Sequence, residues 1–112
     1  MISGMLSLTK DQKKDFKATM DEAQKEATPV HEQIVKSRDA IAEAVGAGKG
    51  QVDINQLVNA EAALETQMAT IELMAFAKLF KTLDASQQSK ATGVIYMIRG
   101  VFNTGKNWNS SE

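Results

Sequence analysis

The sequence predicts an all-α protein built around one long helical hairpin. Two similar helix-start motifs stand near the beginning and late in the chain, Leu8-Thr9-Lys10-Asp11-Gln12 and Leu83-Asp84-Ala85-Ser86-Gln87. Between them, apolar or small residues recur at alternating spacings of four and three, which is typical of one face of a helix. Three glycines crowd the segment 46–50, roughly midway between the motifs. Together these features predict two long arms joined by a flexible turn.

Each motif has the pattern of a capping box. Thr9 or Asp84 at the N-cap can accept a hydrogen bond from the amide three residues on, while Gln12 or Gln87 reaches back to the amide of the cap. The two boxes therefore predict the starts of two helices. Residues 1–8 precede the cap Thr9 and are expected to form a flexible N-terminus.

The first arm contains Pro29, the only proline in the chain. A proline inside a helix removes one hydrogen bond and clashes with the preceding turn. Two outcomes are open: Thr28 caps a new helix with Pro29 at its first position, or one helix kinks there. The seam of apolar or small residues passes through this point unbroken and comprises Phe16, Met20, Ala23, Ala27, Val30, Ile34, Ser37, Ile41 and Ala44.

The glycine-rich segment 46–50 ends the first arm and supplies the turn of the hairpin. A phosphate-binding loop would need a preceding strand and a Gly-Lys-Ser/Thr sequence. Neither is present, because the local order is Gly48-Lys49-Gly50-Gln51. The segment is therefore interpreted as a turn.

The return helix is expected to start at Asp53, a plausible cap, and to run to about Thr82. Glu61 falls on its seam and is expected to pair across the hairpin with Lys36 or Arg38. The return seam comprises Leu57, Glu61, Leu64, Met68, Ile71, Ala75 and Lys78.

The second half of the return helix is apolar nearly all round, since the only polar residues between positions 71 and 83 are Glu72, Lys78, Lys81 and Thr82. Such a helix must be covered on several sides, and a chain of 112 residues has few elements to cover it. Methionines at helical spacing suit core packing, but they also suit surfaces that bind varied partners. We assign the surplus to a client-binding or dimer surface: Met68, Ile71, Leu73, Met74, Phe76 and Phe80.

The last helix begins at the second box and is expected to cover part of the return helix with one apolar face. After Asn103 the composition turns to Asn, Gly, Ser and Thr with an isolated Trp108. The expected organisation is a flexible N-terminus (1–8), a single domain of about four helices (9–102) and a flexible tail (103–112). The apolar face comprises Ala91, Val94, Ile95, Ile98, Val101 and Phe102.

Composition restricts the possible functions. The formal net charge is −1, so the composition shows no basic surface of the kind that neutralises nucleic-acid phosphates. No apolar run approaches the roughly 20 residues of a membrane helix, and the N-terminus lacks the basic and apolar parts of a signal peptide. The absence of Cys excludes disulfides and thiolate metal sites.

An enzyme is not predicted. Glu61, Glu65 and Glu72 could share one helix face as a paired-acid site, but the chain offers no accompanying nucleophile, second histidine or glycine-shaped pocket. His31, the only histidine, would need carboxylate help to bind a metal, because zinc sites usually have three or four ligands. A surface or interface histidine is favoured over a metal ligand, and no cofactor is assigned.

The paired boxes on a long hairpin resemble the Spy/CpxP group of periplasmic proteins, also called the LTXXQ-motif family. The likeness covers roughly residues 8–102. Asp84 stands where the family usually has Thr, and Asp is an equally good cap. The residues that carry the likeness are Leu8, Thr9, Gln12, Leu83, Asp84 and Gln87.

This resemblance implies a four-helix protomer, an antiparallel homodimer, a periplasmic location and ATP-independent binding of unfolded or aggregation-prone proteins in envelope stress. Some relatives instead sense or buffer metals. The exporting leader of the family is not in this sequence, so the periplasmic expectation rests on the resemblance alone. The hypotheses are a chaperone-like protein, a metal sensor or buffer, and a helical adaptor that docks one partner helix in a groove.

Overall fold

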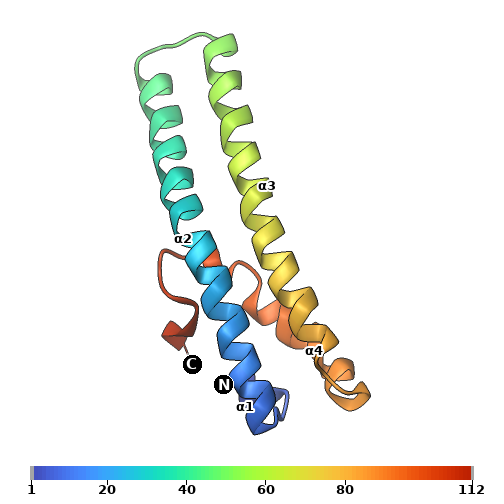
Figure 1. Ribbon diagram of the computed structural model, residues 1–112. Coiled ribbons are helices and arrows are strands. Elements are labelled where there is room, and N and C mark those ends of the chain that lie inside the picture. Colours follow the sequence, from blue (N-terminus) through green and yellow to red (C-terminus); the bar gives the residue numbers. More distant parts are fainter. Residues whose placement is uncertain (1, 112) are drawn as a thin grey trace.

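The computed structural model describes residues 2–111, and the regular elements of this part of the chain are all helical. A single turn, α1 (Ile2–Met5), precedes three longer helices, α2 (Lys10–Gly46), α3 (Gln51–Lys81) and α4 (Ala85–Ile98). Two short 3₁₀ helices follow, η1 (Val101–Asn103) and η2 (Trp108–Ser111). Helices α2 and α3 lie side by side in opposite directions and form a hairpin (Figure 1). The predicted all-α fold is confirmed.

Both capping boxes are present at the starts of α2 and α4. In the first, Thr9 Oγ1 accepts from the amide of Gln12 at 3.1 Å, and the amide of Thr9 donates to Gln12 Oε1 at 2.9 Å. In the second, the amide of Gln87 donates to Asp84 Oδ1 and the amide of Asp84 donates to Gln87 Oε1, both at 2.9 Å. Each box thereby satisfies two amides that a helix start would leave without partners.

The two boxes are also bonded to each other. Nε2 of Gln12 donates to Oε1 of Gln87 and Nε2 of Gln87 donates to Oε1 of Gln12, each at 2.8 Å. Each side-chain amide also donates its second hydrogen to a backbone carbonyl. Gln12 Nε2 donates to the carbonyl of Thr82 at 3.0 Å, and Gln87 Nε2 donates to the carbonyl of Ser7 at 3.2 Å. Both side-chain amides therefore use their two donors and both acceptor positions, and the starts of α2 and α4 are joined.

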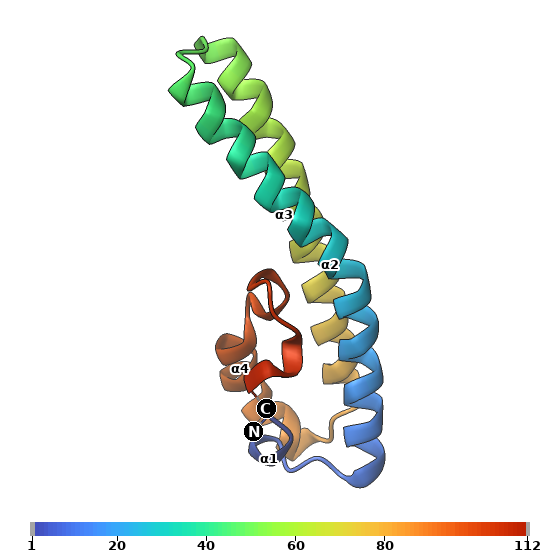
Figure 2. The same ribbon diagram turned by 90° about the vertical axis from the view of Figure 1, so that its left-hand side faces the viewer.

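Helix α2 continues through Pro29 without a new start. The hydroxyl of Thr28 donates to the carbonyl of Gln24 at 2.9 Å instead of capping a second helix. A bend is visible near the middle of the hairpin (Figure 2), consistent with the loss of one amide donor at the proline. The alternative of a broken first arm is wrong, and the described chain has three helices longer than one turn rather than about four.

The turn of the hairpin follows the expected glycine-rich segment. Helix α2 ends at Gly46, and Gly48 adopts φ of +71°, a left-handed conformation that suits glycine. Helix α3 begins at Gln51 after Gly50, so the prediction that Asp53 caps it is wrong. Asp53 lies instead in the first turn, where a negative charge complements the helix dipole.

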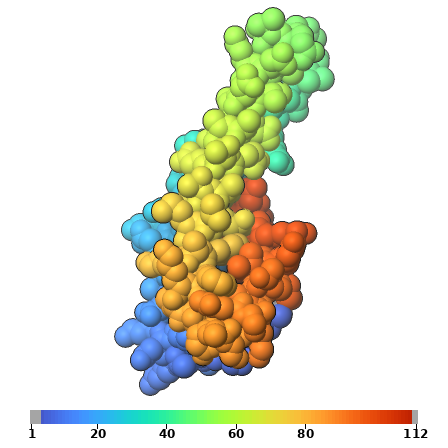
Figure 3. Space-filling view, turned by 90° about the vertical axis from the view of Figure 1, so that its right-hand side faces the viewer, coloured from blue at the N-terminus to red at the C-terminus, as the bar shows by residue number. Residues whose placement is uncertain are grey.

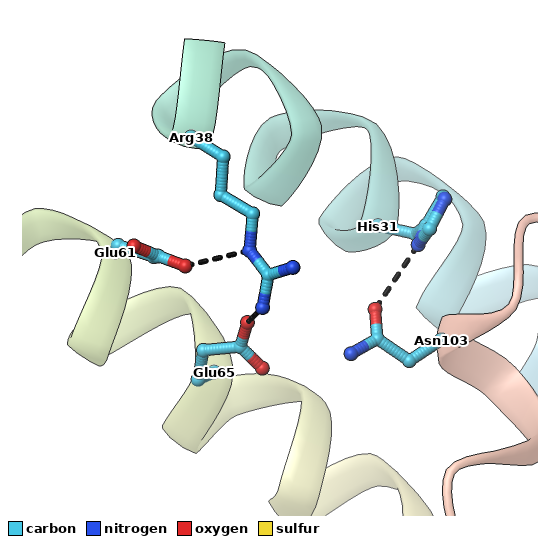
Figure 4. Close-up of polar contacts among 5 residues, drawn as sticks. All are labelled: His31, Arg38, Glu61, Glu65 and Asn103. Atoms are coloured by element: carbon cyan, nitrogen blue, oxygen red, sulfur yellow. Dashed lines mark hydrogen bonds and ion pairs between the residues drawn. The ribbon is translucent and has the colours of Figure 1, made fainter. Parts of the chain in front are cut away.

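The predicted seam of α2 forms the centre of the core. Ser37 and Ile41 are half-buried, and the other seam residues are buried: Phe16, Met20, Ala23, Ala27, Val30, Ile34 and Ala44. Towards the turn, Arg38 pairs with Glu61 at 2.7 Å and with Glu65 at 3.1 Å (Figure 4), which confirms the pairing of Glu61 with Arg38. The two carboxylates raise the pKa of Arg38, chiefly through the hydrogen bond to Glu61. This contact links the two arms on the turn side of Pro29.

One face of the lower hairpin is covered by the chain termini and α4, which lie together on one side in Figure 2. Leu6 and Leu8 are 6% and 8% exposed and belong to the same core as Phe76 and Val94. The expected flexible N-terminus therefore contributes two buried leucines. Burial of each removes apolar surface from water, which a free N-terminus would leave exposed.

The C-terminal segment also differs from the expected flexible tail. Trp108 is 6% exposed and packs edge-on against Phe16, with ring centroids 5.5 Å apart. Its indole N–H donates to Asp21 Oδ1 at 2.9 Å, and its backbone amide donates to Gln24 Oε1 at 2.8 Å. A single aromatic side chain with a satisfied polar N–H can bury a large area, and here it anchors an otherwise polar segment.

Docking of this segment is expected to weaken in acid. Hydrogen bonds from Lys17 and then from Trp108 lower the pKa of Asp21 below its ordinary 3.8. A carboxylate whose pKa is lower in the folded protein than in the unfolded chain stabilises the folded protein at pH values above the unfolded pKa. This contribution is lost as the pH falls through the folded pKa. Because Trp108 is the only tryptophan, its fluorescence should titrate below about pH 4. In Asp21→Asn this titration should be reduced; an unchanged titration would count against the contact.

Candidate binding surface

A groove of about 640 Å³ runs between α2 and α3. It opens on the face of the hairpin opposite to α4. On α2, Glu22 lines the groove while Gln24, about 200° further round the helix, contacts Trp108. On α3, Met74 lines the groove. Glu72 lies about 200° away from Met74 around the helix and accepts a hydrogen bond from the amide of Gly100. The groove is lined by Thr19, Glu22, Ala23, Glu26, Gln67, Thr70, Ile71, Met74, Ala75, Ala77, Lys78 and Lys81.

Small side chains explain the hollow. Ala23 and Ala75 are each 6% exposed and lie on the seam of the two helices, where larger residues would fill the space. Ile71 is half-buried beside them, and Met74 is 67% exposed. The groove thus has an apolar centre with no other segment of the described chain covering it.

The two edges of the groove carry opposite charges. Its charged residues on α2 are Glu22 and Glu26, and its charged residues on α3 are Lys78 and Lys81. All four are exposed, and none forms an ion pair with another residue of the range 2–111. The acidic edge and the basic edge therefore remain available to a partner.

Further large apolar side chains are exposed outside the groove. Leu73 and Phe80 on α3 are 67% and 38% exposed, and Tyr96 and Met97 on α4 are 63% and 61% exposed. Figure 3 shows the side of the molecule on which α3 runs along the long axis with α4 beside its lower half. Arg99 lies over the ring of Tyr96, 5.2 Å from its centroid, which places a cation next to this apolar surface.

The six residues predicted to form a client or dimer surface lie in three different environments. Met68 and Phe76 are 5% and 8% exposed and belong to the core of the protomer, so their assignment to a surface is wrong. Residues of the two chain termini and of α4 pack against this part of α3 and cover it. Ile71 lines the groove, and the other three residues are exposed: Leu73, Met74 and Phe80.

A second, smaller cavity of about 30 Å³ lies where Leu8, Phe76 and Ile98 meet and is partly open to the surface. Its size is close to that of one water molecule, and its apolar lining offers little to hold one. Its volume is far below that of a site for a drug-sized ligand.

His31 contacts the C-terminal segment. Its Nδ1 lies 3.0 Å from Oδ1 of Asn103 (Figure 4), and a Cβ atom added at Gly105 would lie 3.2 Å from its Nε2. Within residues 2–111, no group of three or more histidine, cysteine or acidic side chains could hold a metal ion. His31 is half-buried and contacts both the end of η1 at Asn103 and the segment that follows it.

Two exposed residues of α4, Tyr96 and Met97, are absent from the predicted surface. The sequence carried a signal for them, because the inward face of α4 falls at Val94, Ile95 and Ile98, and the adjacent positions 96 and 97 must point elsewhere. Trp108 had no such signal, since it follows a polar segment without periodicity.

None of the helices described within residues 2–111 combines the length and the apolar character needed to cross a bilayer. Comparison of the chain with protein-family models, with curated proteins and with solved structures found no match. The functional interpretation therefore rests on the residues and on the geometry described above.

Proposed function

We propose that this protein is an ATP-independent, chaperone-like protein that holds partly unfolded or aggregation-prone proteins. The observation that carries this proposal is the set of large apolar side chains exposed on α3 and α4, led by Leu73, Tyr96 and Met97, each more than 60% exposed. Exposed apolar residues on two neighbouring helices are candidates for an interaction surface, because contiguous apolar patches mark the interaction sites of proteins. The resemblance of the two capping boxes to the LTXXQ motif supports the same function, and with it a periplasmic location.

The small number of these residues favours weak binding. Full burial of one large apolar side chain contributes about 1.5–3 kcal/mol, so two or three of them supply roughly 4–8 kcal/mol before the cost of association. Without that cost, the range would correspond to dissociation constants between about 1 mM and 1 μM. The cost of association subtracts from it, so the client is bound more weakly than these values. A client held so weakly can dissociate and fold, which is the behaviour that a chaperone without ATP requires.

The test is suppression of the aggregation of a chemically denatured model enzyme, followed by light scattering. The native protein in several-fold molar excess is expected to suppress aggregation, and Leu73→Ser/Met97→Ser is expected to lose most of this effect because it removes two exposed apolar contacts. Helix content measured by circular dichroism should not change, since both side chains are more than 60% exposed.

The matched control is Val45→Ser/Val52→Ser, which removes two exposed apolar side chains beside the turn of the hairpin, 59% and 71% exposed. This variant should suppress aggregation as the native protein does. Equal losses in both variants would show that general surface hydrophobicity, and not the α3–α4 surface, binds the client. No suppression by the native protein would refute the proposed function.

A further inference from the structure

The groove between α2 and α3 has a charge pattern that selects a particular occupant. Its acidic edge, Glu22 and Glu26, and its basic edge, Lys78 and Lys81, flank an uncovered apolar centre. A surface with one edge of each sign is complementary to a copy of itself. We propose that the groove is the contact surface of a homodimer in which two hairpins face each other and point in the same direction.

The direction follows from symmetry. A two-fold axis parallel to the helices places α2 of one copy opposite α3 of the other, so each acidic edge meets a basic edge. A two-fold axis across the helices places α2 opposite α2 and α3 opposite α3, so that like charges meet, which is destabilising. The charges therefore favour the parallel dimer over the antiparallel dimer that the family resemblance implies.

The heights of the charged residues are compatible with this arrangement. The bridges of Arg38 to Glu61 and Glu65 place residue 38 of α2 level with residues 61–65 of α3. One step along α2 matches one step back along α3 in an antiparallel pair, so residue 22 lies level with about residue 79. Glu22 of one copy would then lie between the levels of Lys78 and Lys81 of the other.

The contact is small. The lining residues of α3 span positions 67–81, about 22 Å of helix at 1.5 Å per residue. An interface of this length and two helices wide is at the low end of specific interfaces. We expect a weak dimer whose population rises with protein concentration and falls with added salt, because exposed charges at its edges are screened.

The test is sedimentation velocity at several protein concentrations in low salt. The native protein is expected to dimerise, Glu22→Lys/Glu26→Lys and Lys78→Glu/Lys81→Glu are each expected to be monomers, and a 1:1 mixture of the two variants is expected to dimerise again. The control Asp39→Lys/Glu43→Lys makes the same change of net charge at exposed positions outside the groove and should dimerise as the native protein does.

The absence of native Cys allows the orientation to be tested by cross-linking. Under oxidation, Glu22→Cys mixed with Lys78→Cys should give a disulfide-linked heterodimer, and Glu22→Cys alone should stay mostly monomeric. Efficient linking of Glu22→Cys to itself would overturn the parallel arrangement. A native protein that is monomeric at all concentrations would overturn the dimer, while the aggregation test, which uses residues outside the groove, would remain unaffected.

Discussion

Replacing Trp108 by Ala is expected to destabilise the protein by about 3–5 kcal/mol, the usual cost of truncating a buried aromatic side chain. Trp108 is 6% exposed, contacts Phe16 edge-on and donates its indole N–H to Asp21. Its loss would leave a large void beside Phe16 and free the segment that follows η1. Since a small domain has a total stability of about 5–15 kcal/mol, the effect would be a large fraction of the whole.

Urea unfolding followed by circular dichroism at equilibrium would measure this loss. Trp108→Phe is the informative comparison, because it keeps an aromatic ring against Phe16 while removing the indole donor and part of the ring volume, and it should lose less stability than Trp108→Ala. A Trp108→Ala variant within about 0.5 kcal/mol of the native protein, the range of ordinary surface substitutions, would show that the C-terminal segment does not belong to the core.

The second large effect is expected at Gln87, which is 6% exposed. Gln87→Ala should cost about 2–3 kcal/mol, because it leaves three partly buried groups without their partner, and an unsatisfied group costs about 1–3 kcal/mol where water cannot replace the lost bond. The groups are the side-chain amide of Gln12, the amide of Asp84 and the carbonyl of Ser7. Gln12→Ala should cost less, since Gln12 is only half-buried and water can replace part of its bonding.

A double-mutant cycle with Gln12→Ala and Gln87→Ala would separate two views of the capping boxes. If each box only starts its own helix, the two losses should add. The reciprocal amide pair, with both bonds at 2.8 Å, predicts a coupling energy of at least about 1 kcal/mol. Additive losses would therefore contradict the joined boxes even if each single variant is destabilised.

The candidate surface shows how far a sequence-based prediction of function can reach. The apolar surplus of α3 was predicted from composition, and it supplies Leu73, Met74 and Phe80 to the exposed surface and Ile71 to the groove. Met68 and Phe76 were placed on that surface wrongly. Deciding which members of the surplus remain exposed requires knowing what covers the rest, and that cover comes from α4 together with the two termini.

The sequence by itself determined the features that depend on neighbours three or four residues away: the two capping boxes, the seam of α2 and the glycine turn. The residues that make such contacts are three or four positions apart, so the sequence pattern alone predicts them. Only the tertiary structure decided that Gln12 bonds to Gln87, that Trp108 packs on Phe16, and that the groove between α2 and α3 stays open. These contacts join residues far apart in the sequence, where complementary shape and unsatisfied polar groups, and not periodicity, select the partner.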